Sequence, residues 1–259
     1  MEILNIGANH EIIKNIKKET YKKQEMFVVD DLSVLESDYC KQLQSEILLF
    51  CSPLIHSKEA HETLSFYKNK AKQCFEVSEK VFLSVCEKEN CAGILVVCKK
   101  QKINLQSFKD SNFLLVLDGI EMHGNLGTIL RSCDATGVNG VINTNVKANI
   151  YSNKVIHSSR GMVLKVPFVC EELDEVIKFL KDNKYRIILC ETLDGVSFEK
   201  QDYKGKIAIV VGSERFGIDK RWISEKTENV YIPMQGEMHS LNVSVATSIV
   251  LYQALISRK

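Results

Sequence analysis

Five polar residues in the second half of the chain have side chains that could recognise a phosphate-bearing ligand: Asn125, Arg131, Glu214, Ser240 and Asn242. A guanidinium group can donate two parallel hydrogen bonds to phosphate oxygens, and amide, hydroxyl and carboxylate groups can hydrogen-bond to hydroxyl groups. They arrive in three short segments, each of which follows an apolar run. This repeated order makes them the candidate functional residues.

The apolar runs before these segments predict the elements that position them. Residues 113–117 and 207–211 are continuous apolar runs, typical of parallel strands buried on both faces, and residues 230–232 are also strand-like. In open α/β sheets, ligands bind outside the carboxyl ends of the strands. The sequence therefore predicts an α/β domain with a parallel sheet, with the three polar segments meeting at one edge.

Two helices are expected beside this edge. One begins near Asn125 and contains Arg131, which would face the same sheet edge. The other covers the apolar run from Val243 to Ile256, and Ser240 is its expected N-cap.

The segments Asn-x-Gly-x-x-x-Arg (125–131), Gly-Ser-Glu (212–214), and Ile-Pro-Met (232–234) with Ser-Leu-Asn-Val-Ser (240–244) resemble the three motifs of the SpoU/TrmH family of RNA ribose 2′-O-methyltransferases, within the SPOUT superfamily. The resemblance covers about the last three-fifths of the chain. Within the family, Ser159-Arg160-Gly161 followed by Pro167 is similar to the thiopeptide-resistance rRNA methyltransferases.

The resemblance implies a C-terminal domain with a trefoil knot that binds S-adenosylmethionine in a bent form. The loops that would hold this cofactor contain Gly212, Ile232, Met234 and Leu241. A glycine at 212 would let backbone approach a ligand closely because it has no Cβ. The chain has no Gly-x-Gly-x-x-Gly segment after a strand, so a Rossmann-type cofactor site is not expected. The resemblance also implies a homodimer whose interface uses the C-terminal helix.

The same resemblance implies catalytic roles for the five polar residues. Arg131 matches the arginine proposed in the family to take the proton from the ribose hydroxyl, but an arginine is normally protonated, so both a base and a phosphate clamp remain open roles. Ser240 and Asn242 would contact the ribose or position Arg131. Glu214 would pair with Arg131 or orient its neighbours. His123 stands where many relatives carry proline, which leaves the local loop geometry open.

The first part of the chain predicts a separate domain. Helix-like and strand-like segments alternate up to about residue 100, which indicates a small α/β sandwich, and a polar linker runs over residues 99–112. We place the N-terminal domain at 1–105 and the catalytic domain at 111–259. The resemblance implies that this N-terminal domain is similar to certain RNA-binding ribosomal proteins and binds the RNA substrate.

Basic residues suggest where RNA would bind. Within an expected helix from Glu11 to Lys23, the helical spacing aligns Lys14, Lys17, Lys18 and Lys22 along one face. Such a stripe could follow an RNA backbone or be a solvated face. Arg160 is a candidate for a second phosphate contact.

The composition bears on RNA binding, metal binding and membrane association. With 34 basic and 33 acidic residues the net charge is +1, so RNA binding would need local patches. The nine cysteines and six histidines show no metal-binding spacing, and buried free thiols in a reducing cytoplasm are the expected state of the cysteines. No secretory signal pattern and no run of about 18 apolar residues is found, so no membrane association is expected.

These observations predict a cytoplasmic S-adenosylmethionine-dependent RNA 2′-O-methyltransferase acting on rRNA. Two alternatives stay open. One is a SPOUT enzyme that methylates a base of tRNA or rRNA, and the other is a non-catalytic RNA-binding protein with the same fold.

Overall fold

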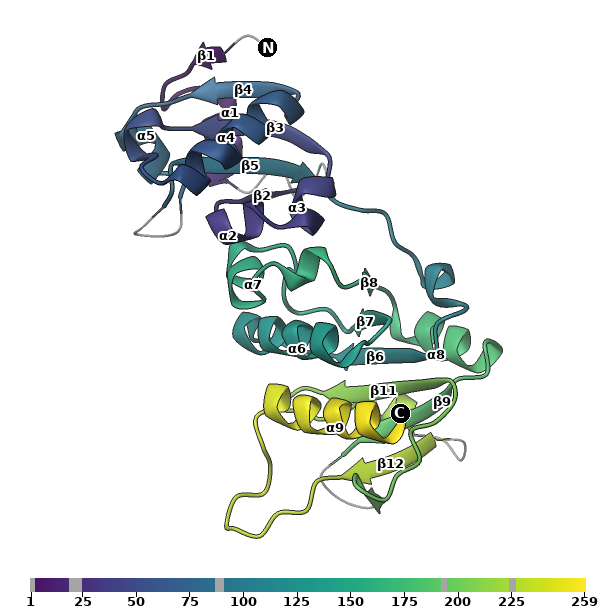
Figure 1. Cartoon of the computed structure of the whole chain (residues 1–259). Helices are drawn as coiled ribbons and strands as arrows, with labels where there is room; N and C mark the ends of the chain where they lie inside the picture. The colour runs from purple at the N-terminus through teal and green to yellow at the C-terminus, as the bar shows by residue number, and fades with distance from the viewer. Residues whose placement is uncertain (1–2, 19–24, 87–90, 192–194, 224–226) are drawn as a thin grey trace. The chain divides into compact units, whose positions relative to one another are not determined.

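The computed structural model describes residues 3–18, 25–86, 91–191, 195–223 and 227–259 (Figure 1). Contacts within the chain divide it into two compact units. The first comprises Met1–Lys102 together with Tyr151–Gly161, and the second comprises Ile103–Ile150 with Met162–Lys259.

The first unit contains a mixed five-stranded sheet in the order β1-β4-β3-β5-β2. β4 pairs in parallel with β1 and β3, whereas β5 pairs antiparallel to β3 and β2. The strands are β1 (Ile3–Asn5), β2 (Met26–Val29), β3 (Ser45–Phe50), β4 (Gln73–Glu76) and β5 (Ile94–Lys99). The helices are α1 (Glu11–Lys17), α2 (Leu32–Leu35), α3 (Asp38–Gln42), the short η2 (Ser52–Leu54), α4 (Lys58–Lys70), α5 (Glu79–Leu83) and α7 (Asn153–Ser158).

Helix α7 belongs to the first unit although it lies far along the chain. Its His157 Nε2 is 2.7 Å from Asp30 Oδ1, and the Tyr39 hydroxyl donates to the Arg160 carbonyl at 3.0 Å. The Tyr151 ring stacks on Phe27 with centroids 4.9 Å apart. The predicted boundary assigned this segment to the catalytic domain. No local pattern of residues indicates these contacts, because the partners are more than 100 residues apart along the chain.

The second unit is built on seven strands, all paired in parallel, in the order β10-β12-β9-β11-β6-β7-β8. The strands are β6 (Phe113–Asp118), β7 (Gly140–Thr144), β8 (Phe168–Cys170), β9 (Arg186–Cys190), β10 (Val196–Ser197), β11 (Ile207–Gly212) and β12 (Thr227–Tyr231). The helices are η3 (Leu105–Phe108), α6 (His123–Thr136), η4 (Met162–Leu164), α8 (Leu173–Asp182), η5 (Lys220–Trp222) and α9 (Val243–Ser257). The parallel sheet predicted from the apolar runs is confirmed.

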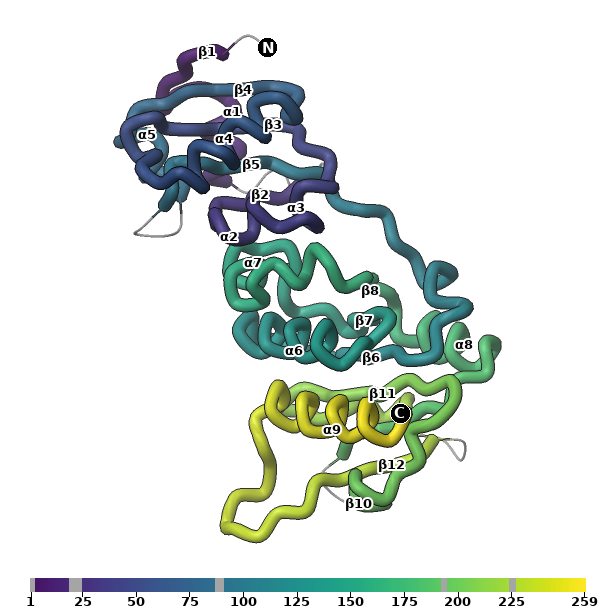
Figure 2. Tube along the Cα trace, in the orientation of Figure 1, coloured from purple at the N-terminus to yellow at the C-terminus, as the bar shows by residue number. Residues whose placement is uncertain are grey.

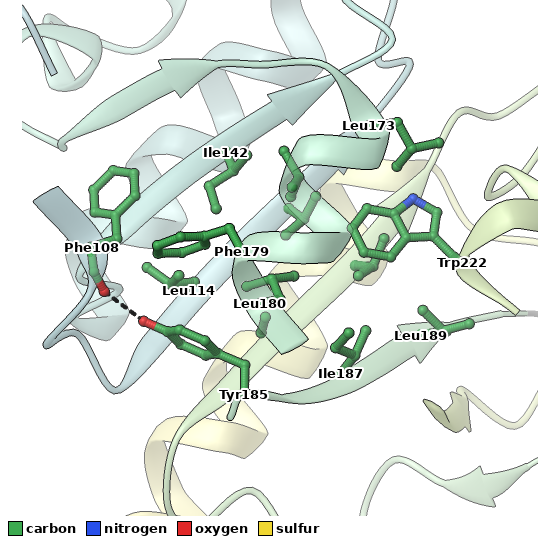
Figure 3. Close-up of a cluster of buried hydrophobic side chains, with 14 of the residues drawn as sticks. Phe108, Leu114, Ile142, Leu173, Phe179, Leu180, Tyr185, Ile187, Leu189 and Trp222 are labelled. Atoms are coloured by element: carbon green, nitrogen blue, oxygen red, sulfur yellow. Dashed lines mark hydrogen bonds between the residues drawn. The ribbon is translucent and has the colours of Figure 1, made fainter. Parts of the chain in front are cut away.

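The core of the second unit forms between the sheet and α8. Alternate residues of β6 and β11, among them Leu114 and Val210, pack with Leu180 of α8 and with Trp222 (Figure 3). Helices α6 and α9 pack side by side (Figure 2), and the Ser132 and Ser248 hydroxyls lie 2.7 Å apart between them. This pairing fixes α9 relative to α6, and therefore the two motif segments that these helices carry.

Part of the predicted linker belongs to this core. Helix η3 inserts Phe108, which is 2% exposed, and a Cβ added to Gly140 would lie 2.3 Å from its ring. The Tyr185 hydroxyl lies 2.7 Å from the carbonyl oxygens of Phe108 and Ser111 and donates its one hydrogen between them. Figure 3 shows the contact with Phe108. A single aromatic residue in a polar run has no periodicity, so only the tertiary structure identifies Phe108 as core.

Candidate active site

The three motif segments emerge from the carboxyl ends of β6, β11 and β12 in the second unit. β11 and β6 are neighbours, and β9 separates β11 from β12. Because all these strands run in the same direction, the segments start from one edge of the sheet.

Three of the five candidate residues form one hydrogen-bonded group at this edge. The Asn125 amide donates to Glu214 Oε1, and Asn242 Nδ2 donates to Asn125 Oδ1 and to Glu214 Oε1, each at 3.1 Å. Asn125 is buried. A single carboxylate oxygen thus ties together the starts of α6 and α9 and the loop after β11. Of the two roles expected for Glu214, the hydrogen bonds show the second: Glu214 orients its neighbours Asn125 and Asn242 and does not pair with Arg131.

Asn242, not Ser240, is the N-cap of α9. The Asn242 side-chain oxygen accepts hydrogen bonds from the Ser244 backbone N–H at 3.0 Å and from the Ser244 hydroxyl at 2.6 Å. The helix therefore starts at Val243, and the expectation that Ser240 caps it is wrong. Both residue types are good N-caps, so propensity alone did not separate them.

The loop carrying Glu214 is closed on itself. Ser213 N–H donates to the Gly217 carbonyl at 3.0 Å, and Gly217 N–H donates back at 2.9 Å. A Cβ on Gly212 would lie 2.2 Å from Gly217 backbone atoms. The return of the chain at Gly217 therefore already requires a glycine at 212.

A cavity of about 350 Å³ lies beside the hydrogen-bonded group. It brings together all four residues expected to bind the cofactor, and also Glu214 and Ser240. The lining residues are Cys190, Glu191, Val211, Gly212, Ser213, Glu214, Gly217, Ile218, Ile232, Met234, His239, Ser240, Leu241, Val243 and Ala246.

Sequence reasoning missed Cys190 and Glu191, which end and follow β9. The available signal was the same as for the other motifs, a polar residue directly after an apolar strand. Burial raises the pKa of the Cys190 thiol to about 11, with a smaller contribution from Glu191. Burial thus favours the neutral thiol over the thiolate, which is the nucleophilic form.

The cavity suits S-adenosylmethionine. Its volume lies within the range of about 300–1,000 Å³ of small-molecule sites. Ile218, Ile232 and Leu241 supply apolar walls, and the carboxylates of Glu191 and Glu214 complement a positively charged sulfonium.

Arg131 is not brought to the cavity. It lies on α6, six residues after Asn125, or about 9 Å further along the helix axis. Its side chain is exposed and makes no hydrogen bond or ion pair with the residues that the structure describes. The expectation that Arg131 faces the same edge as the other motif residues is therefore not met within one chain.

The predicted RNA contacts lie in the first unit. Arg160 is exposed, with a backbone φ of +50°, and belongs to the segment grouped with the N-terminal residues. Lys14, Lys17 and Lys18 are exposed on and just after α1, which is shorter than the predicted helix. Lys22 lies outside the described residues.

Other expectations concern cysteines, metals and membranes. All nine cysteines are free, and five of them are buried: Cys40, Cys51, Cys74, Cys98 and Cys133. In the described ranges, no group of three or more His, Cys, Asp or Glu side chains could hold a metal ion. No helix of the described chain is both long and apolar enough to span a membrane.

Comparison with known proteins identifies the class of this fold and site. Residues 112–252 match the model of the SpoU rRNA Methylase family, which is more than half of the chain. The chain belongs to this family. It is an S-adenosylmethionine-dependent RNA methyltransferase.

Individual relatives agree with this assignment. The chain is 29% identical over 180 residues to RlmP, the 23S rRNA (guanosine(2553)-2′-O)-methyltransferase of Bacillus subtilis, covering 70% of this chain and 71% of the relative. TrmH family relatives from Staphylococcus are 37% identical over 147 residues, and there the chain spans 59% of the relative's length. In structure it resembles an AdoMet-bound rRNA methyltransferase from Sinorhizobium meliloti with a TM-score of 0.86 at 21% identity, with 97% of each chain covered.

Proposed function

We propose that the protein transfers a methyl group to the 2′-hydroxyl of a ribose in ribosomal RNA. The observation that carries this proposal is the group of Asn125, Glu214 and Asn242 beside the cavity, because it offers amide and carboxylate groups suited to hydroxyl recognition where the family motifs meet. The name of the Bacillus relative adds both the ribose position and the rRNA substrate.

When bound, S-adenosylmethionine supplies a methyl group whose bond to sulfur breaks as the ribose oxygen bonds to the carbon. The chain's residues hold the cofactor through Gly212, Ile232, Met234 and Leu241, and keep one side of the cavity apolar. Glu214 already orders both amides. Because Asn242 uses its two N–H groups on Asn125 and Glu214, the second N–H of Asn125 and the second oxygen of Glu214 are the groups that would meet the ribose hydroxyls.

Arg131 clamps a substrate phosphate in this proposal. Its exposed guanidinium forms no ion pair with the described residues, so no ion pair has to break before it binds a phosphate. The planar guanidinium can donate hydrogen bonds to two phosphate oxygens. In this arrangement the hydroxyl proton would pass to a phosphate oxygen that Arg131 holds, whereas the family proposal passes it to the arginine itself, assisted by that phosphate.

Arg131 reaches the site through assembly. Val245 and Tyr252, which are 48% and 47% exposed, lie with Ile249 on one side of α9 and form an apolar stripe suited to a second copy. We propose a homodimer through this stripe, with a site completed near the interface. A monomeric mass in light scattering at micromolar concentration, with activity retained, would contradict it.

The proposal also covers the roles of the two units and the location of the protein in the cell. The second unit would form the trefoil knot of the family, and the first unit would bind the RNA substrate as an N-terminal recognition domain. The free cysteines fit a reducing cytoplasm, where RNA is methylated.

The decisive experiment is nucleoside analysis by mass spectrometry. RNA from cells with and without the active protein is digested to nucleosides, and the new methyl group is assigned to a ribose or a base. A methylated base would favour the SPOUT base-methyltransferase alternative. Methylation of tRNA would contradict the proposed rRNA substrate. It would agree with the names of the staphylococcal relatives, which give both tRNA and rRNA as substrates.

A further inference from the structure

Next to each of the three motif segments, one large apolar side chain is exposed near the carboxyl edge of the parallel sheet. Met122 precedes Asn125 and is 60% exposed, Phe216 follows Glu214 and is 75% exposed, and Met238 precedes Ser240 and is 70% exposed. Large exposed apolar side chains gathered around a site mark a surface that contacts a ligand or partner.

The exposure of Phe216 is fixed by its loop. The paired backbone hydrogen bonds between Ser213 and Gly217 close the loop, and the Phe216 N–H donates to the Ser213 hydroxyl oxygen at 3.1 Å. In the same loop, Glu214 is held by Asn125 and Asn242. Phe216 is therefore presented outward in a defined position relative to the candidate active site.

Arg215 stands beside this ring. Its guanidinium carbon is 5.5 Å from the Phe216 ring centroid, and within the described chain it has no acidic partner. The loop thus offers a cation at Arg215 and an aromatic face at Phe216, directly after the Glu214 carboxylate that orients the site.

We infer that Arg215 and Phe216 form a stacking platform for a base of the RNA substrate next to the methylated ribose, with Arg215 contacting the adjoining phosphate. This inference rests on the proposed function and names the residues that position its substrate. Bases stack on aromatic side chains whatever their identity, and arginine serves both phosphate and base faces.

A second copy of the protein could also cover the exposed Arg215 and Phe216, but the charge of Arg215 favours RNA. Burying Arg215 in a protein interface would remove its charge from water without an opposite charge to pair with. RNA supplies a phosphate for Arg215 and a π-face for Phe216 at the same place.

The test compares two probes on the full chain by fluorescence anisotropy. One is a labelled 20-nucleotide single-stranded RNA of mixed sequence, and the other is an abasic ribose-phosphate strand of the same length. F216A should weaken binding to the RNA about tenfold or more and leave the abasic strand unaffected, because base stacking is lost. F216L should behave like F216A, whereas F216W should bind as the wild type does.

R215A should weaken binding to both probes and reduce the slope of log affinity against log salt by about 0.7. Neither residue lines the cavity, so S-adenosylmethionine binding should stay unchanged in every variant. I223A is the matched control: Ile223 is 65% exposed in the same unit but precedes β12 and lies outside the motif segments.

Three results would overturn the inference: wild-type RNA affinity in F216A, an equal loss on both probes, or a halved mass of F216A in light scattering, which would assign Phe216 to a contact between copies. Failure of the proposed function looks different. The wild type would then leave no 2′-O-methyl mark, whatever the variants do.

Discussion

Asn242 Nδ2 donates a hydrogen bond to Glu214 Oε1 at 3.1 Å, while Asn242 Oδ1 accepts the Ser244 backbone N–H at the start of α9. One side chain therefore both caps the C-terminal helix and fixes the carboxylate beside the cavity. Its two roles can be separated experimentally.

Replacing Asn242 by aspartate should keep the cap and break the link to Glu214, since a carboxylate accepts the Ser244 N–H but cannot donate to another carboxylate. N242D should methylate RNA at least tenfold more slowly, and repulsion between its new carboxylate and that of Glu214 should lower its melting temperature although the cap is kept. N242A should lose both activity and about 1 kcal/mol of stability. N104A is the control, because Asn104 caps η3 away from the motif segments and should reduce only stability. Unchanged activity in N242D would show that the link has no catalytic role.

Arg131 to alanine should abolish methylation without affecting cofactor binding. The side chain is exposed and does not line the cavity, so both the fold and the S-adenosylmethionine contacts should be preserved. R131K should not restore activity, because an ammonium lacks the planar fork. Calorimetry with S-adenosylmethionine and tritium transfer to RNA measure the two effects, and K181A serves as a surface control. Loss of cofactor binding in R131A would reassign the residue to a structural role.

Asp219 should make stability depend on pH in the acid range. Hydrogen bonds from the Arg221 side chain and backbone lower the pKa of Asp219 to about 2. A carboxyl with a lowered folded-state pKa stabilises the fold above its unfolded pKa of about 3.9, and this stabilisation disappears as the pH falls toward 2. D219N should therefore be less stable than the wild type at pH 7. The difference in urea unfolding should shrink below pH 4, and a difference independent of pH would exclude the charge as its cause.

Lys14 and Lys18 should contribute to RNA affinity through phosphate contacts. They lie four residues apart, are exposed, and have no ion pair within the described chain. K14Q/K18Q should reduce the salt slope of RNA binding by about 1.4–1.8, corresponding to two phosphates. K181Q/K184Q, with one lysine in the last turn of α8 and the other just after this helix, is the matched pair. Equal slopes in the wild type and K14Q/K18Q would mean that the lysine stripe is only solvated.

Phe108 should decide where the catalytic domain begins. A fragment starting at Ser111 lacks Phe108 and would leave an unfilled space next to Gly140 in the core. We expect full-length F108A to lose about 3–5 kcal/mol of stability. The fragment 111–259 should accordingly melt well below the fragment 103–259 in calorimetry. Equal melting temperatures would restore the boundary at 111.

The sequence by itself determined the family and the parallel sheet, and it indicated the three residues, Asn125, Glu214 and Asn242, that form the hydrogen-bonded group. These follow from local signals: apolar runs for β6 and β11, and polar motifs directly after strands. These signals can be recognised in the sequence because a buried strand and the polar residues that follow it are neighbours along the chain.

Only the tertiary structure decided which residues meet. It showed that Asn242 caps α9, that Gly212 makes room for Gly217, that Phe108 belongs to the core and that α7 packs with the first unit. It also left Arg131 away from the cavity of its own chain. These outcomes depend on contacts between residues distant in sequence, and no local pattern of residue types encodes such contacts.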